Sequence, residues 1–388
     1  MYTIKTMNQI SSDGLSRLGQ EYQLDSEAKD PDGIIVRSAS LHDENFSERT
    51  KAIARAGAGV NNIPIDRCSE AGIVVFNTPG ANANAVKELV FAGLLLSARK
   101  VYQGIAWTKN DQEGNLGKRV EKEKKHFAGS ELMGKSLGII GLGAIGIQVA
   151  NLALKFGMQV YGYDPYISID AAWNLSRSVI RANSADDIYK NCDYITIHVP
   201  LNDNTKHMIN SQSLAQMKDG VRLLNFARGA LVDDKVLIQA IHNGKVAAYV
   251  TDFPTDLLAA ETNVITIPHL GASTQEAEEN CVLKAVEELK DFLENGNILN
   301  SVNLPNVQME RTECERIGVI HRNIPNMLAQ IAEALAKNHI NIANMINKSK
   351  KDYAYTLIDL DEAIDEHSLN DVKQIDGVIR VNVYPSNQ

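Results

Sequence analysis

The sequence has 388 residues, 44% of them hydrophobic, which is enough for two or three domains with buried cores. Its formal net charge of −9 at pH 7 argues against general binding to nucleic acid or to a membrane surface. The four cysteines lie far apart and form no CxxC pair or Cys/His cluster, so we expect reduced thiols and no metal site.

The first hundred residues alternate short apolar runs with helix-like stretches. Strands are predicted within residues 33–40, 51–59 and 72–83, each followed by a loop or turn. Residues 85–101 predict a helix that is apolar nearly all round, which we expect to be buried. Strands that alternate with helices indicate a parallel sheet.

Residues 109–130 are highly charged, and we interpret them as an exposed connection between domains. A second α/β series starts near residue 135, with strands predicted in the segments SLGIIG, QVYGYD, YITIHVP, VRLLNFA, AAYVTDF and NVITIPH. A long helix is predicted over 273–296. Ser273 and Glu276 fit a capping box at its start, and Gly296 fits a cap at its end.

A third unit starts near residue 312 and has the element order βαββαβ, which is typical of a small ferredoxin-like domain. The predicted fold class of the whole chain is therefore α/β. It comprises two doubly wound Rossmann- or flavodoxin-like domains and a C-terminal ferredoxin-like domain.

The segment GLGAIG (141–146) has the spacing GxGxxG of a dinucleotide-binding turn and lies between a predicted strand and a predicted helix. Gly141 allows the tight turn, Gly143 lets the backbone approach a pyrophosphate, and Gly146 lets the helix pack closely. The free N–H groups of the helix then face the phosphates. Asp164, at the end of the next strand, can accept hydrogen bonds from both ribose hydroxyls and would repel a 2′-phosphate. The cofactor NAD is therefore favoured over NADP.

Charged side chains follow three further strands of this series. Arg228 follows one strand, Asp252 and Asp256 follow the next, and His269 follows the last. In a doubly wound sheet, ligands bind beyond the carboxyl ends of the strands. A guanidinium binds a carboxylate through two parallel hydrogen bonds, and an imidazole exchanges a hydroxyl proton near neutral pH. Together these residues indicate hydride transfer on a hydroxy acid.

Five segments, in order, give the chain a resemblance to the D-2-hydroxyacid dehydrogenase family, and within it to the phosphoglycerate dehydrogenase branch. They are ARAGAGVNNI (54–63), FNTPGANA (76–83), LGIIGLGAIG (137–146), NFARGALVDD (225–234) and IPHLGAST (267–274). The resemblance implies a discontinuous substrate-binding domain, residues 1–100 and 285–308, around an NAD-binding domain, residues 101–284. Residues 312–388 resemble an ACT domain, a small regulatory fold.

The resemblance also implies catalytic roles. Arg228 would hold the substrate carboxylate, and His269 would exchange the proton of the substrate hydroxyl. The third catalytic residue of the family is a glutamate at the position that is Leu257 here. We expect Asp256 to take its place as the partner of His269, with Glu261 as the alternative.

Further residues match positions that contact the cofactor and the substrate in the family. The cofactor contacts implied by the resemblance, besides the three glycines and Asp164, are Thr78, Ala144, Ile145, Val199, Phe226, Ala227, Asp252, Gly271 and Ala272. The implied substrate contacts are Arg37, Ser38 and Arg55. The residues that bind the substrate phosphate are only partly visible in the sequence.

In related enzymes the ACT fold binds amino acids between paired domains. His321, Asn323 and Asn341 fall where serine-binding residues lie in the family, so L-serine is a hypothetical effector. The family usually has Pro-Gly at the adjoining loop, and here the pair is Pro325-Asn326. Asparagine tolerates a positive φ better than most residues, so the loop can be kept. The domain could instead serve only to assemble subunits.

The activity that the resemblance implies is the NAD-dependent oxidation of 3-phospho-D-glycerate to 3-phosphohydroxypyruvate, the first step of serine synthesis. The alternatives are a reductase of hydroxypyruvate, glyoxylate or another 2-keto acid, and an NAD-sensing scaffold without enzymatic activity. We expect a homodimer or homotetramer. The sequence starts without a signal-peptide pattern and has no run that could span a bilayer, so a cytoplasmic location is expected.

Overall fold

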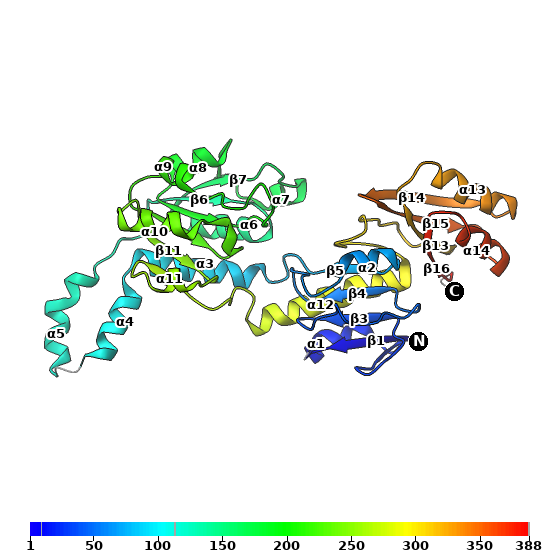
Figure 1. Ribbon diagram of the computed structural model, residues 1–388, viewed down its shortest axis with the longest axis horizontal. Coiled ribbons are helices and arrows are strands. Elements are labelled where there is room, and N and C mark those ends of the chain that lie inside the picture. Colours follow the sequence, from blue (N-terminus) through cyan, green and yellow to red (C-terminus); the bar gives the residue numbers. More distant parts are fainter. Residues whose placement is uncertain (9, 112–113, 387–388) are drawn as a thin grey trace. The chain divides into compact units, whose positions relative to one another are not determined.

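The computed structural model describes residues 1–8, 10–111 and 114–386 (Figure 1). The chain forms two compact units, residues 1–81 together with 278–388, and residues 82–277. The three domains expected from the sequence have other limits and stay a prediction, because a division into compact units does not show which segments fold independently.

The first unit contains a five-stranded parallel sheet in the order β2-β1-β3-β4-β5, the order of flavodoxin-like folds. Its strands are β1 (Tyr2–Met7), β2 (Tyr22–Leu24), β3 (Gly33–Val36), β4 (Ala52–Arg55) and β5 (Val74–Asn77). The helical segments that follow these strands or pack on them are α1 (Ser12–Leu15), η1 (Ser16–Leu18), α2 (Ile65–Glu70) and most of α12 (Gln275–Asn295).

Helix α12 packs against this sheet through one apolar stripe. Val282, Val286 and Leu289 share a buried core with the strand residues Ile4 and Ile35. The predicted capping box is wrong in its residues. The hydroxyl of Thr274, not of Ser273, accepts a hydrogen bond from the N–H of Ala277 at 3.1 Å. The predicted end is confirmed, because Gly296 has φ +75 and its N–H donates to the carbonyl of Phe292.

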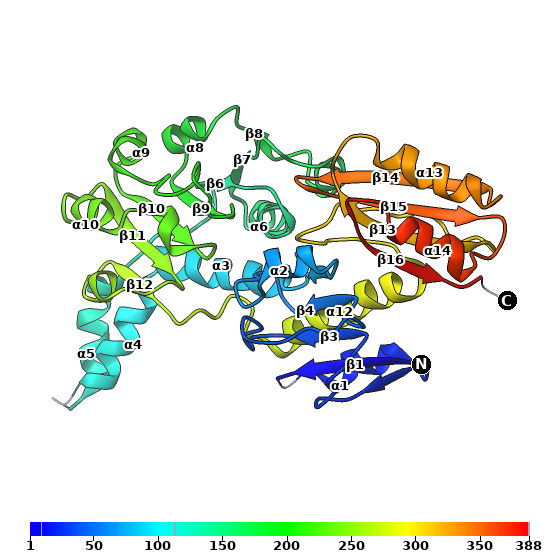
Figure 2. The same cartoon turned by 45° about the vertical axis from the view of Figure 1, so that its right-hand side comes forward.

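The C-terminal part of the first unit is a four-stranded antiparallel sheet in the order β14-β15-β13-β16, which confirms the predicted βαββαβ arrangement. Its elements are β13 (Glu315–Arg322), α13 (Met327–Lys337), β14 (Ile342–Lys350), β15 (Tyr353–Leu360), α14 (Glu366–Lys373) and β16 (Val378–Tyr384). Helices α13 and α14 cover one face of the sheet (Figure 2).

The opposite face of this sheet shares the core of the first unit. Tyr355, Leu357 and Tyr384 are buried in the same cluster as Phe292 of α12. The hydroxyl of Tyr355 donates to the carbonyl of Gly296 at 2.8 Å. The C-terminal sheet therefore packs directly on the end of α12 through apolar contacts.

The second unit contains a seven-stranded parallel sheet in the order β12-β11-β10-β9-β6-β7-β8, which is the Rossmann order with an added strand. The strands are β6 (Ser136–Ile140), β7 (Gln159–Tyr163), β8 (Ile180–Arg181), β9 (Tyr194–Ile197), β10 (Val221–Asn225), β11 (Val246–Thr251) and β12 (Val264–Thr266). The strand order reverses between β6 and β9, where doubly wound folds bind ligands.

Two apolar cores cover the two faces of this sheet. The helical segments of the second unit are α3 (Ala83–Ala98), α4 (Val101–Asn110), α5 (Leu116–Glu123), η2 (Lys124–Phe127), α6 (Ala144–Lys155), α7 (Ile169–Asn174), α8 (Ala185–Asn191), α9 (Ser211–Gln216), η3 (Gly229–Leu231), α10 (Asp234–His242) and α11 (Asp256–Ala259). Residues 109–130, predicted as a connection, thus include α5 and η2, whose side chains are not buried.

Candidate active site

The glycine-rich turn between β6 and α6 has the geometry of a phosphate-binding loop. Gly141 has φ +97, and a Cβ there would lie 2.5 Å from the carbonyl oxygen of His198. A Cβ at Gly146 would lie 2.0 Å from the carbonyl oxygen of Gly141, so only glycine allows this packing. At Gly143, the N-cap of α6, nothing lies within 4 Å of the Cβ position. The backbone there is open to a ligand, as a pyrophosphate requires.

Asp164 directly follows β7 and is fixed by two backbone hydrogen bonds. Its Oδ2 accepts from the N–H of Leu142 at 2.9 Å, and its Oδ1 accepts from the N–H of Tyr166 at 2.8 Å. The carboxylate borders a pocket of about 540 Å³ whose other lining residues include Gly162, Ile167 and Arg181. A ribose with its base fits a pocket of this size beside the glycine-rich turn. These features fit NAD at this edge of the sheet.

The other expected cofactor residues fall into two groups. Those in the second unit follow the carboxyl ends of β6, β9, β10, β11 and β12, and they are Ala144, Ile145, Val199, Phe226, Ala227, Asp252, Gly271 and Ala272. Phe226 is also a core residue, since a Cβ on Gly93 of α3 would lie 3.0 Å from its ring. Thr78 belongs to the first unit, where its side chain is buried.

His269 lies three residues beyond the end of β12, with an exposed side chain. Its ring packs against the ring of Phe253, with centroids 4.7 Å apart. No residue that the structure describes forms a hydrogen bond with the His269 ring, so both nitrogens can reach a ligand. His269 and Phe253 border a pocket of about 730 Å³ in the second unit, which Asp252 and His207 also line.

Asp252 is the acid that interacts electrostatically with His269. Its side chain is buried, and its Oδ2 accepts a hydrogen bond from the N–H of Gly271 at 3.3 Å. Burial raises the pKa of Asp252, while the positive charges of His269 and Arg228 counteract this rise. Asp252 was expected from the sequence as a cofactor contact, not as the partner of the histidine.

Neither of the two acids that were expected to partner His269 forms a hydrogen bond or ion pair with its ring among the residues that the structure describes. Asp256 is the first residue of α11 and is exposed, and its side chain forms no hydrogen bond or ion pair within the described part of the chain. Glu261 accepts a hydrogen bond from His242 at 2.9 Å. Leu257, at the family's glutamate position, is exposed. The assignment of Asp256 as partner remains a prediction.

Hydrogen bonds to the backbone of Arg228 hold this residue in place, and its guanidinium is exposed. The buried side chain of Asn225 donates to the carbonyl of Arg228 at 2.9 Å and accepts from the N–H of Ala227 at 3.1 Å. Asn225 also donates to the hydroxyl of Tyr249. The sequence analysis missed this asparagine. Its place at the last position of an apolar strand was the available signal, because a buried polar side chain there needs partners.

The expected substrate residues of the first unit lie at the carboxyl ends of adjacent strands. Arg37 follows β3, and Arg55 ends β4 and donates from Nε to the carbonyl of Arg37 at 3.1 Å. Arg37 also forms an ion pair with Glu278 of α12. The Oδ1 of Asn8 accepts from the N–H groups of Ser38 and Ala39 and so shapes the loop after Arg37. The structure thus brings the guanidinium of Arg55 to the backbone of Arg37 within one unit.

The three expected effector residues are engaged within the C-terminal sheet. His321 is buried, its Nδ1 lying 2.8 Å from the carbonyl oxygen of Arg322 and its Nε2 2.9 Å from the hydroxyl of Thr356. Asn323 donates to the carbonyl of Lys351, and Asn341 donates to Asp361. Asn323 and Asn341 lie beyond opposite ends of the sheet, because Arg322 pairs with Tyr353 and Ile342 pairs with Leu360. One copy of the chain does not gather the three side chains into one site.

The structure also bears on metals, thiols and membrane spans. Within residues 1–8, 10–111 and 114–386, no three His, Cys, Asp or Glu side chains gather where they could hold a metal ion. The four cysteines are free thiols. No helix in the described ranges combines the length and the apolar character that crossing a membrane requires.

The Rossmann sheet, the glycine-rich turn and the charged residues at the strand ends define a class, the nucleotide-binding dehydrogenases. The family model of the D-isomer specific 2-hydroxyacid dehydrogenase NAD binding domain matches residues 91–271. A hydroxypyruvate reductase from Thermotoga maritima is 39% identical over 270 residues, which cover 66% of this chain and 83% of that protein. The chain belongs to the D-isomer-specific 2-hydroxyacid dehydrogenase family, and its cofactor is NAD.

Other relatives are D-3-phosphoglycerate dehydrogenases. The protein of Methanocaldococcus jannaschii is 39% identical over 293 residues, and that of Bacillus subtilis is 33% identical over 341 residues. The matches cover 73% and 83% of this chain, and 54% and 62% of those relatives. The chain thus spans between half and two thirds of their length.

Solved structures give the same family. The NAD⁺-bound 3-phosphoglycerate dehydrogenase of Entamoeba histolytica has a TM-score of 0.60 at 26% identity, and it covers 78% of this chain and 98% of its own. A glyoxylate reductase of Paecilomyes thermophila has a TM-score of 0.63 at 26% identity, with the same coverage.

Proposed function

We propose that this protein oxidises the hydroxyl group of 3-phospho-D-glycerate to the ketone of 3-phosphohydroxypyruvate with NAD, the first step of serine synthesis. The observation that carries the proposal is the pair Arg37 and Arg55 at the ends of β3 and β4. In a chain of net charge −9, arginines at the ends of two adjacent strands supply positive charge that a phosphorylated acid needs, and the acid would compete with Glu278 for Arg37. The identity to several phosphoglycerate dehydrogenases supports the same substrate.

In this proposal the second unit carries out the proton transfer. Bound NAD supplies the hydride acceptor. His269, whose ring is exposed and packs at a tilt against Phe253, accepts the proton of the substrate hydroxyl during oxidation and returns it during reduction. The buried carboxylate of Asp252 stabilises the positive charge that His269 gains.

Arg228 binds the substrate carboxylate in the same proposal. Its guanidinium is exposed, and its own backbone is held by the buried Asn225. A planar guanidinium fixes both oxygens of a carboxylate and therefore the orientation of the adjoining C2 atom. Asn225 acts as a positioning residue, because it touches only the protein.

The test is NADH oxidation by the purified protein with 3-phosphohydroxypyruvate, hydroxypyruvate and glyoxylate. The proposal predicts a strong preference for the phosphorylated keto acid. Arg55→Met should raise the KM of the phosphorylated acid more than that of the other two, because it removes a phosphate contact. Arg17→Met is the matched control, since Arg17 is an exposed arginine of η1 in the same unit.

A second candidate is a reductase of unphosphorylated 2-keto acids. The hydroxypyruvate reductase of Thermotoga maritima favours it, because this relative matches over 83% of its own length. Equal or faster turnover of hydroxypyruvate or glyoxylate in the same assay would establish this candidate. An NAD-sensing scaffold would turn over none of the three substrates and would still bind NADH.

We further propose a cytoplasmic homodimer or homotetramer in which the C-terminal domain either senses L-serine or joins subunits. Free thiols support the location, and exposed apolar side chains on α4, among them Val101, Tyr102 and Ile105, support self-association. Sedimentation with and without L-serine tests the assembly. Titration calorimetry that shows no heat at millimolar L-serine would argue strongly against serine binding.

A further inference from the structure

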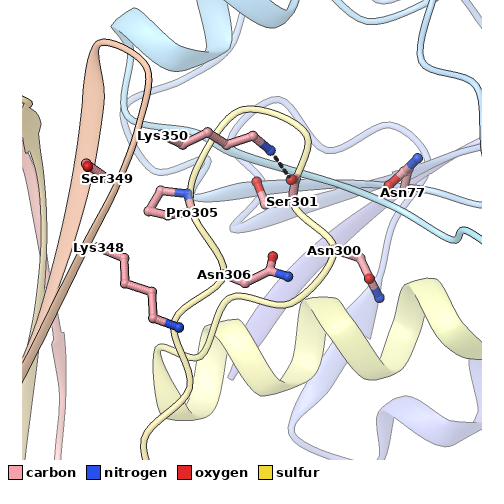
Figure 3. A pocket seen from close by; sticks show the side chains of 8 residues that line it. All are labelled: Asn77, Asn300, Ser301, Pro305, Asn306, Lys348, Ser349 and Lys350. Atoms are coloured by element: carbon pink, nitrogen blue, oxygen red, sulfur yellow. Dashed lines mark hydrogen bonds between the residues drawn. The ribbon is translucent and has the colours of Figure 1, made fainter. Parts of the chain in front are cut away.

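A pocket of about 630 Å³ in the first unit is lined by none of the expected catalytic, cofactor or substrate residues (Figure 3). Three segments form it: the end of β5, the loop after α12, and the last residues of β14. Its lining residues are Asn77, Asn300, Ser301, Pro305, Asn306, Lys348, Ser349 and Lys350. The pocket therefore lies where the C-terminal sheet meets the first parallel sheet.

The loop wall of this pocket is built before any ligand binds. Asn300 has φ +57 and donates from Nδ2 to Glu288 of α12 at 2.6 Å. Ser301 forms a β-bridge with Phe76, and its hydroxyl donates to Asn303 at 3.0 Å. These contacts fix the loop on both sides, so a ligand would not have to order it.

The opposite wall presents two lysines. Side chains alternate along a strand, so Lys348 and Lys350 point to one face of β14 and Ser349 to the other, as Figure 3 shows. Lys350 donates to the carbonyl of Ser301 at 2.9 Å, which leaves two of its three N–H donors unused. The side chain of Lys348 forms no hydrogen bond or ion pair with any residue in the described ranges.

The charge of this pocket is unbalanced. None of its eight lining residues is acidic, although the chain as a whole carries a net charge of −9. Burial and the neighbouring Lys351 both lower the pKa of Lys350, so its charged form is less favourable than in water. A bound anion would favour the charged form of Lys350 and so offset the effects of burial and of Lys351. The exposed amide of Asn306 has no partner among the described residues and can donate to such an anion.

We propose that this pocket binds a small dianionic oxyanion of the phosphate-monoester class between Lys348, Lys350 and Asn306. Two ammonium groups and a side-chain amide offer donors from several directions, which suits a tetrahedral dianion better than a planar monoanion. The bound anion would join β14 to the loop of residues 300–306. The loop is in turn connected to the segment after β4 through Asn77, whose N–H donates to the carbonyl of Asn300 and whose side chain donates to the carbonyl of Ala58.

Anion binding in this pocket does not require the proposed activity, so binding is what the test measures. Titration calorimetry with inorganic phosphate, at constant ionic strength, is the first measurement. Asn306→Asp should weaken binding at least about tenfold, because it places a negative charge beside the anion. This substitution changes an exposed side chain with no partner, so the fold should be kept. Lys348→Met should act in the same direction, and sulfate should replace phosphate while acetate should not.

Lys351→Met is the control for general charge, since Lys351 is exposed at the adjoining turn and does not line the pocket. Its effect should stay within about twofold. The contrary outcome is that phosphate binds only at Arg37 and Arg55 of the first sheet. In that case Arg55→Met would abolish binding and Asn306→Asp would not change it, which would overturn the proposal. An absence of saturable binding at millimolar phosphate, or equal effects of Lys351→Met and Lys348→Met, would also overturn it.

Discussion

The guanidinium of Arg316 and the carboxylate of Asp359 form an ion pair with no solvent exposure on either side chain, with Nε 2.6 Å from Oδ1. Arg316 also donates to the carbonyl of Asn295, the last residue of α12, and to those of Met309 and Glu310 in the segment that connects α12 to β13. A buried arginine with this many partners fixes the connection between the two sheets of the first unit.

We predict that Arg316→Met lowers the free energy of unfolding by about 3–5 kcal/mol, because Asp359 is then buried without a partner. Urea denaturation measures the change. The double variant Arg316→Met with Asp359→Leu should recover part of the loss, since the unpaired charge is removed. A loss below about 1 kcal/mol in the single variant would mean that solvent reaches Asp359.

His269→Ala should lower turnover by about two to four orders of magnitude, because no other group in the proposal accepts the hydroxyl proton. NADH binding should remain nearly unchanged, and fluorescence titration of NADH provides this control. A small loss of turnover would assign the proton transfer to another residue.

A comparison of Asp252→Asn with Asp256→Asn identifies the acid that assists His269. The electrostatic interaction of the buried Asp252 with His269 favours Asp252, so its loss should reduce kcat about 10- to 100-fold. Asp256→Asn, at an exposed helix start, should change kcat by less than about threefold. The reverse result would restore Asp256 as the partner.

The buried carboxyl group of Glu288 should make the stability of the protein depend on pH. Burial raises its pKa from 4.5 to about 7, although Asn300 donates a hydrogen bond to it. Between these two values the folded state holds a proton that the unfolded state has lost, so stability should fall as pH rises from about 4.5 to about 7. Above pH 7 the loss of folding stability reaches its full size, which corresponds to ~1.4 kcal/mol for each unit by which the pKa is raised.

Glu288→Gln should remove this part of the pH dependence, because the amide does not titrate and can still accept from Asn300. Thermal unfolding of both proteins across this pH range makes the comparison. Parallel pH profiles for the two proteins would show that Glu288 is ionised in the folded state without a penalty.

Local patterns explain why much of the fold could be predicted. The glycine spacing at 141–146 and the alternating strands and helices depend on residues close in sequence, and the structure confirms the Rossmann order and the ferredoxin-like end. The start of α12 was misassigned because Ser273 and Thr274 are adjacent hydroxyl residues, and only the backbone path decides which one caps the helix.

The site depends on contacts between distant residues, and these were harder to predict. Asn8 shapes the loop after β3 from the end of β1, and Asn225 holds Arg228 through a buried amide. Both look like ordinary polar residues in the sequence. Asp252 was recognised from its motif, but its interaction with His269 follows from the adjacent positions of β11 and β12 in the sheet.

The shared core of the first unit has a consequence for its dynamics. Tyr355 and Tyr384 of the C-terminal sheet are buried with Phe292 and Phe76, so neither sheet can open without exposing apolar surface of the other. The amide hydrogens of β13 and β15 should therefore exchange with solvent through the same cooperative opening as those of β3 and β4. A protein cut after residue 308 would lose part of its own interior rather than a separable attachment.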